Sequence, residues 1–226
     1  MKNLALKMVF PAMIQILLMS GFRADAQDLK DVDGNVYKIA KLGPQDWTAS
    51  NLIVTHFRNG DAIPEAKTAE EWAAAAREGK PAWCYYENDT ANLRKYGLLY
   101  NWYAVNDQRG LAPEGWHIPV SRDWSTLVKN LIGIDVAGPK LKSTEGWKRK
   151  PGTDKIGFKA LPGGSREADG KFSGIGVIGQ WWTTSVPVSV KPSDKIITFW
   201  LSDNIASVRY YDADKGAGFS VRCEKD

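Results

Sequence analysis

Aromatic side chains are the residues of this chain best suited to bind a ligand. Its 226 residues include 10 Trp and 8 Tyr, and several of them lie in the second half of the sequence. A flat aromatic face accepts the C–H groups of a sugar ring, while the sugar hydroxyls form hydrogen bonds with neighbouring polar groups. Packing in the core is the alternative role of such large residues. The candidates are Trp147, Trp181, Trp182, Trp200, Tyr210 and Tyr211.

A short polar pair follows Trp200 and is a further candidate for ligand binding. Asp203 and Asn204 stand in an order similar to the Trp-Asn-Asp motif with which C-type lectins bind calcium and sugar. The spacing differs, however, and the sequence has no Glu-Pro-Asn or Gln-Pro-Asp tripeptide. We therefore expect no calcium-dependent sugar binding. We also expect no metal site and no cofactor. A hairpin turn is the alternative role of the pair.

The sequence lacks the motifs of common hydrolases. It has neither a Gly-x-Ser-x-Gly elbow nor a His-Glu-x-x-His motif, and its two histidines are His56 and His117. We expect His117 to form structural hydrogen bonds beside the start of a helix. These observations predict a protein that is not an enzyme.

Two glycine-containing motifs predict turns. Residues 174–179 match the Gly-x-Gly-x-x-Gly fingerprint of dinucleotide-binding proteins, which requires a strand before it and a helix after it. Residues 180–184 are typical of a strand instead, so nucleotide binding is not expected. The order Asp-x-Asp-Gly-Asn in residues 31–35 also begins calcium loops, but the later ligands of an EF-hand are missing.

The N-terminal segment is typical of a secretory signal peptide. Lys2 and Lys7 precede a mostly apolar stretch over residues 8–19, and small residues surround the expected cleavage point after Ala26. The stretch is too short to favour a membrane anchor. Gln27 occupies the place where a lipoprotein would carry its cysteine. We expect a signal peptide at residues 1–26, one domain at residues 27–226, and an exported protein that is not a lipoprotein.

Export would place the two cysteines, Cys84 and Cys223, in an oxidising compartment. An even number of cysteines in an oxidising compartment favours a disulfide. A metal pair and a free nucleophile are the alternatives, although the sequence has no Cys-x-x-Cys motif. The formal net charge of +4 is too small to favour nucleic-acid binding, and no segment of the expected domain is apolar enough to span a membrane.

Local signals predict an α+β fold. Thr68 can cap a helix that ends at Glu78 before Gly79, and Ser121 can cap a second helix that runs to about Leu131. No further helix is expected after residue 138, where glycine-rich turns separate short strands. The expected strands are 36–40, 47–54, 83–86, 96–105, 181–185, 196–201, 208–211 and 219–222.

Several motifs together resemble the Fibrobacter succinogenes major paralogous domain (FISUMP) family. The resemblance covers essentially the whole expected domain, and it implies export and disulfide bonds. In the early Trp-Met-x-x-Asn-Leu motif this chain has Thr48 in place of Met. The motifs are Asp33-Gly-Asn-Val-Tyr37, Trp83-Cys-Tyr-Tyr86, Tyr96-Gly-Leu-Leu-Tyr-Asn-Trp-Tyr-Ala-Val105, Gly115-Trp-His-Ile-Pro119, Ala160-Leu-Pro-Gly-Gly164, Trp181-Trp182 and Gly218-Phe-Ser-Val-Arg-Cys223.

A more distant resemblance is to the C-type-lectin-like fold, including formylglycine-generating enzymes. Residues 116–124 and 161–165 carry it, together with the Gly-Phe-x-x-Arg ending. It implies a small twisted antiparallel sheet with two flanking helices and a long, loop-rich second half. Those enzymes use two nearby cysteines late in the chain, where this sequence has Cys223 alone. No catalytic residue is therefore carried over.

These observations lead to one functional hypothesis and one alternative. We expect a secreted or surface-associated, non-catalytic module that binds polysaccharide or glycan, with no nucleic-acid partner. The alternative is a structural or adhesive protein that contacts another protein of the bacterial cell envelope. The expected ligand-binding residues are Trp147, Trp181, Trp182, Asp203, Asn204, Tyr210 and Tyr211.

Overall fold

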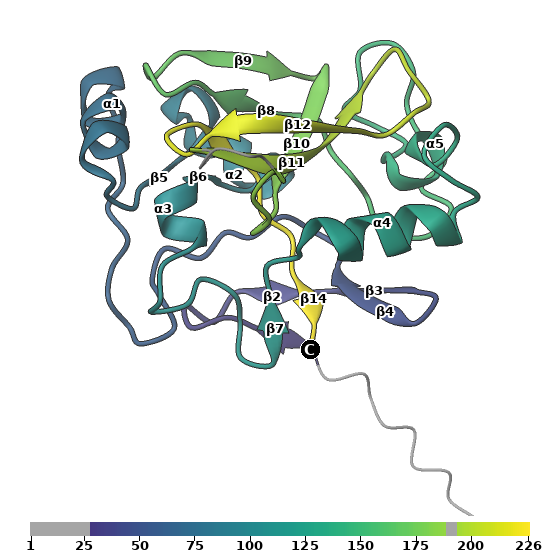
Figure 1. Ribbon diagram of the computed structural model, residues 1–226, viewed down its shortest axis with the longest axis horizontal. Coiled ribbons are helices and arrows are strands. Elements are labelled where there is room, and N and C mark those ends of the chain that lie inside the picture. The colour runs from purple at the N-terminus through teal and green to yellow at the C-terminus, as the bar shows by residue number, and fades with distance from the viewer. Residues whose placement is uncertain (1–27, 189–193) are drawn as a thin grey trace, which may run out of the picture.

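The computed structural model describes residues 28–188 and 194–226 (Figure 1). The described chain is a mixed α+β protein in which short strands outnumber the helices. The signal peptide expected at residues 1–26 lies outside the described residues. None of the helices in the described residues has the length and apolarity needed to cross a membrane.

The helices comprise two of ten residues and several shorter turns. They are α1 (Ala69–Glu78), α2 (Leu93–Tyr96), α3 (Trp102–Val105), α4 (Ser121–Asn130) and α5 (Gly138–Leu141), with 3-10 turns at Tyr86–Asn88 and Thr90–Asn92.

The strands are two to eight residues long. They are β1 (Leu29–Lys30), β2 (Val36–Tyr37), β3 (Ile39–Leu42), β4 (Gln45–Thr48), β5 (Trp83–Cys84), β6 (Leu99–Asn101), β7 (Trp116–His117), β8 (Gly163–Arg166), β9 (Phe172–Ile175), β10 (Ile178–Trp182), β11 (Lys195–Ser202), β12 (Arg209–Asp214), β13 (Gly218–Phe219) and β14 (Glu224–Lys225).

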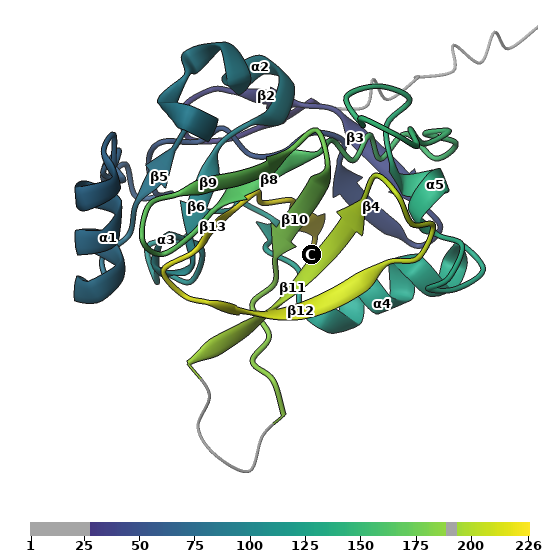
Figure 2. The same cartoon turned by 90° about the horizontal axis from the view of Figure 1, so that it is seen from above.

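Most strands belong to one of two sheets. The larger sheet has the order β12-β11-β10-β8-β13-β6-β5, and β9 pairs with β8. The smaller sheet has the order β3-β4-β14-β7, so the last strand of the chain lies at its centre. In Figure 1 the larger sheet lies above the smaller one, and Figure 2 shows β12 along the outer edge of the larger sheet. The chain therefore ends between segments from its first half.

Helix α1 forms where the sequence predicts it. The side chains of Thr68 and Glu71 each accept a hydrogen bond from the other's backbone N–H, and Gly79 adopts the left-handed conformation that ends the helix. The indole N–H of the buried Trp72 donates a hydrogen bond to the backbone oxygen of Gly216 at 2.9 Å, which attaches the helix to the connection between β12 and β13. A Cβ at residue 218 would lie 2.7 Å from the Trp72 ring, so glycine is required there.

Helix α4 packs between the two sheets. Trp124, Leu127 and Val128 share a hydrophobic cluster with residues of β3, β4 and β11. The helix begins at Ser121, but the expected cap is wrong, because the Asp123 carboxylate accepts the backbone N–H of Val120 at 2.8 Å. An acidic residue in the third helical position performs this capping and also stabilises the helix N-terminus.

Several elements differ from the sequence-based expectation, including β8 and β9, which no expected strand covers. The glycine fingerprint at residues 174–179 connects β9 to β10, so turn glycines occupy it and no helix follows. The single-turn helix α5 was not expected. Residues 96–105, predicted as a strand, contain only β6 between α2 and α3. Asn101 causes this break, because its side chain accepts the backbone N–H of Ala104 at the start of α3.

A buried guanidinium lies near the end of the chain. Arg222 is 1% exposed, and it donates hydrogen bonds to the backbone oxygens of Thr48, Phe158 and Lys159 at 2.6, 2.9 and 3.1 Å. It also donates to Asn51 Oδ1 at 2.7 Å. Burial lowers the pKa of Arg222 to about 9, so the group remains charged at neutral pH. Four acceptors compensate for the removal of this cation from water.

Asn51 extends the same network across the core. Its Oδ1 also accepts the indole N–H of Trp181 at 2.8 Å. Its Nδ2 donates to the backbone oxygen of Tyr96 at 2.7 Å and to Ser220 Oγ at 3.1 Å. The amide thus uses both ends to hold three segments that lie far apart in the sequence.

The network predicts a large stability loss for Arg222→Lys. Lysine keeps the charge but cannot present the planar fork of donors, so backbone carbonyls lose their partners. We expect the free energy of unfolding in urea to fall by roughly 3 kcal/mol, since a hydrogen bond to a charged group contributes about 1.5–3 kcal/mol. The exposed Arg94→Lys is the control, with an expected change below about 0.5 kcal/mol. Equal stability of the two variants would contradict this role of Arg222.

Candidate functional site

Three of the expected ligand-binding tryptophans are buried in the core. Trp181 and Trp182 have no exposed surface, and Trp147 is 6% exposed. The indole N–H of Trp181 donates to Asn51, and those of Trp182 and Trp147 donate to backbone carbonyls. A sugar cannot reach these rings. Their burial contradicts the ligand-binding role, and packing is their role instead.

The two residues of the polar pair after β11 differ in exposure. Asp203 is fully buried, and its carboxylate accepts two hydrogen bonds from the Arg149 guanidinium at 2.9 and 3.0 Å. Asn204 is exposed, and its Oδ1 accepts a hydrogen bond from Ser202 at 2.7 Å. Both residues lie in the connection between the antiparallel strands β11 and β12. The expected role of Asp203 in ligand binding is therefore wrong, and the hairpin role describes the pair.

The two tyrosines of β12 face opposite sides of the sheet. Tyr210 lies opposite Phe199 in the strand register, packs edge-to-face on its ring at 5.7 Å, and approaches Ser125 of α4. Burial raises the pKa of the Tyr210 hydroxyl. Tyr211 is 48% exposed on the other side. Of the seven expected residues, Tyr211 and Asn204 therefore keep the greatest access to solvent.

Tyr211 forms an aromatic pair with Trp200. The ring centroids are 5.3 Å apart and the ring planes are 80° apart. Trp200 is half-buried and lies between Gln180 of β10 and Arg209 of β12 in the register of the three strands. Residues opposite one another in antiparallel strands share a face. An indole ring with an amide and a guanidinium beside it therefore occupies this face, which we call the β10–β12 outer face.

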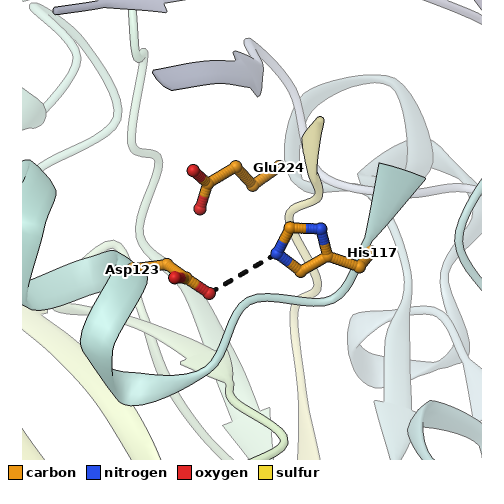
Figure 3. A group of neighbouring side chains, drawn as sticks. All are labelled: His117, Asp123 and Glu224. Atoms are coloured by element: carbon orange, nitrogen blue, oxygen red, sulfur yellow. Dashed lines mark ion pairs between the residues drawn. The ribbon is translucent and has the colours of Figure 1, made fainter. Parts of the chain in front are cut away.

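A second group of side chains meets at the smaller sheet (Figure 3). His117 of β7, Asp123 of α4 and Glu224 of β14 each offer one ligand atom, and these atoms lie within 4.8 Å of one another. His117 and Glu224 are register partners in neighbouring strands. His117 Nε2 is 3.5 Å from Asp123 Oδ2. An imidazole and two carboxylates at such distances can share a proton or a cation.

Neighbouring groups orient each member of this cluster. The Nδ1 of His117 is 2.8 Å from the carboxylate of Asp226, in agreement with the expected hydrogen-bonding role of this histidine. Glu224 Oε1 accepts a hydrogen bond from Gln45 Nε2 at 2.9 Å. Burial raises the pKa of the Glu224 carboxyl, and the negative charge of Asp123 raises it further.

Sequence reasoning missed Asp123, Glu224 and Gln45. His117 and Asp123 belong to one continuous motif, and Glu224 directly follows the cysteine that ends another. The two motifs are about a hundred residues apart, and only the central position of β14 between β4 and β7 joins them. No local spacing pattern predicts such a pairing.

The structure has no disulfide between Cys84 and Cys223, contrary to the expectation. Both cysteines are free and buried. Cys84 lies in β5 at the edge of the larger sheet and packs in a cluster with Trp72 and Tyr86. Cys223 immediately precedes β14 and packs in a different cluster. Burial raises the pKa of the Cys84 thiol to about 11 and raises that of Cys223 as well. Both thiols are therefore inert packing groups in the folded protein.

The described chain is thus a sheet-rich α+β domain, and β14, its last strand, lies at the centre of the smaller sheet. The family model of the Fibrobacter succinogenes major domain matches residues 40–225. The chain belongs to this family. No curated protein and no solved structure matches it significantly.

The free cysteines predict a simple labelling pattern. Without reductant, iodoacetamide should add two groups to the urea-unfolded chain and essentially none to the native chain in the same time, because burial disfavours the reactive thiolate. Intact mass spectrometry reads the result. An unfolded chain that accepts the label only after reduction would show that the two cysteines form a disulfide.

Proposed function

We propose that this protein is a non-catalytic module that binds polysaccharide or glycan on the β10–β12 outer face. The Trp200–Tyr211 pair is the observation that carries the proposal, because these rings remain accessible while Trp147, Trp181 and Trp182 are buried. Stacking on an aromatic ring and hydrogen bonding to adjacent polar groups together recognise a sugar.

The polar groups of this face fit the same ligand chemistry. Gln180 Nε2 donates to Thr198 Oγ1 at 2.8 Å, which fixes the amide beside the Trp200 ring. The exposed Arg209 guanidinium adds hydrogen-bond donors that can bind hydroxyls or the carboxylates of acidic sugars. Because Thr198 holds the Gln180 amide, binding requires little ordering of this side chain.

The expected compartment and the distant fold resemblance support the proposal. A signal peptide at residues 1–26 would export the domain to the periplasm, the cell surface or the medium, where polysaccharides are abundant. A C-type-lectin-like arrangement would agree with a binding module that displays its ligand site on a rigid scaffold. Both remain proposals, and N-terminal sequencing of the protein purified from its native cells tests export.

Substitutions on the β10–β12 outer face test glycan binding. The chain without residues 1–26 is passed over a glycan array and insoluble polysaccharides, and Trp200→Ala and Tyr211→Ala are compared with wild type. We expect each variant to bind at least about tenfold more weakly to the ligand that retains wild type, since a stacking contact contributes on the order of 1.4 kcal/mol.

Tyr103→Ala is the matched control. Tyr103 forms a similar edge-to-face pair with Trp102, but it lies on α3 near the Asp214 end of β12 and belongs to neither aromatic ring of the β10–β12 outer face. The control should bind like wild type. Lack of retention on every polysaccharide, or equal binding by wild type and both outer-face variants, would contradict the proposal.

An exposed apolar patch favours a second candidate function, contact with another envelope protein. Ile132 is 80% exposed, and Ile134 and Val136 are exposed beside it after α4. Ile132 also has φ = 79°, which is costly for a β-branched residue. A photo-crosslinker at residue 132 in intact cells tests this function. A discrete protein adduct would support it, and labelling by water alone would contradict it.

A further inference from the structure

We propose that His117, Asp123 and Glu224 bind a single divalent first-row metal ion, of which Zn²⁺ and Mn²⁺ fit the ligand set best. The three side chains converge from β7, the first turn of α4 and β14 (Figure 3). This site is separate from the β10–β12 outer face and does not depend on glycan binding.

The strongest observation is an unpaired carboxylate oxygen. Glu224 is 9% exposed, and its Oε1 accepts a hydrogen bond from Gln45. Its Oε2 is buried without a hydrogen-bond partner. Figure 3 shows this carboxylate directed toward Asp123 and His117. A buried anionic oxygen without a partner is costly, and a bound cation would remove that cost.

The orientation of His117 fits a metal ligand. Asp226 accepts a hydrogen bond from Nδ1, and this contact directs Nε2 toward Asp123. An ion bound in the cluster would take the Nε2 lone pair, with the ring proton on Nδ1. Ligating histidines commonly donate their other N–H to a carboxylate in this way. Two ligand atoms that are each about 2.0–2.2 Å from a tetrahedral ion lie about 3.4 Å apart. The observed 3.5 Å between His117 Nε2 and Asp123 Oδ2 matches this separation.

The other two ligands are held by backbone and side-chain hydrogen bonds. The N–H of Val120 donates to Asp123 at 2.8 Å, and Gln45 donates both to Glu224 and to the backbone oxygen of Asp123. Gln45 therefore connects the two carboxylate-bearing elements. Such supporting contacts fix ligand geometry before the ion binds.

The ligand set selects among metals. Two carboxylates and one imidazole suit Zn²⁺ and Mn²⁺, whereas Ca²⁺ and Mg²⁺ prefer oxygen ligands alone. The side chains of His117 and Asp123 are partly exposed, so an ion can enter from solvent. Three protein ligands leave a fourth position for water.

Calorimetric titration of the chelator-treated protein without residues 1–26 tests the proposal. We expect one equivalent of Zn²⁺ or Mn²⁺ to bind, and Ca²⁺ to bind far more weakly. Glu224→Gln and His117→Gln should each weaken Zn²⁺ binding at least tenfold. Zn²⁺ should raise the Tm of wild type and leave that of Glu224→Gln unchanged, because only a folded-state ligand shifts the unfolding equilibrium.

His56→Gln is the matched control, since His56 lies 2.6 Å from the Asp33 carboxylate outside the cluster. It should bind Zn²⁺ like wild type. If Glu224→Gln does not fold by circular dichroism, Asp123→Asn replaces it, because the amide oxygen can still cap α4. Failure of folded wild type to bind either ion would overturn the proposal. Equal Zn²⁺ binding by wild type and the ligand variants would also overturn it. A third contrary result is a Glu224→Gln protein that is more stable than wild type, with Zn²⁺ changing the Tm of neither protein, since the cluster then holds a proton instead of a metal ion.

Discussion

The buried guanidinium of Arg222 is the constraint on which the arrangement of this domain depends. A cation removed from water must find acceptors for its N–H groups, and here they come from residues 48–51 and from residues 158 and 159. These acceptors exist together only when the N-terminal strands, the long central loop and the end of the chain meet. Hydrophobic clusters stabilise the fold, but they tolerate several packings, whereas this network specifies one.

The same network determines which aromatic residues are available to a ligand. Asn51 holds the Trp181 indole in the core, so the next strand must turn the face that carries Phe199 inward and the face that carries Trp200 outward. Side chains alternate along a strand, so the register that places Trp181 and Phe199 on one side places Trp200 on the other. On that other side Trp182 and Thr198 are still fully buried, so the accessible part of the β10–β12 outer face is confined to the surroundings of Trp200 and Tyr211.

Sequence alone predicted the features that local chemistry determines. The capping box of α1, the absence of a helix after the glycine fingerprint and the strands β11 and β12 all follow from spacing within about a dozen residues. The family resemblance was also confirmed. Exposure of individual tryptophans was not predictable, because a Trp-Trp pair has the same local pattern in a core as on a surface.

Non-local pairing accounts for the other errors. A disulfide was expected only because the chain has an even number of cysteines and is expected to be exported. In the structure Cys84 and Cys223 pack in different clusters. Asp123 and Glu224 come together because β14 inserts between β4 and β7, a topology that no local motif encodes.

The C-terminal segment is therefore both scaffold and site: Arg222 fixes its path, and two residues later Glu224 faces His117 and Asp123. Diffraction at the zinc absorption edge from crystals of this protein grown with Zn²⁺ tests this account most directly. It predicts one anomalous peak about 2.0–2.2 Å from His117 Nε2 and from a carboxylate oxygen of both Asp123 and Glu224. Well-ordered density for these three side chains with no anomalous peak between them would contradict it.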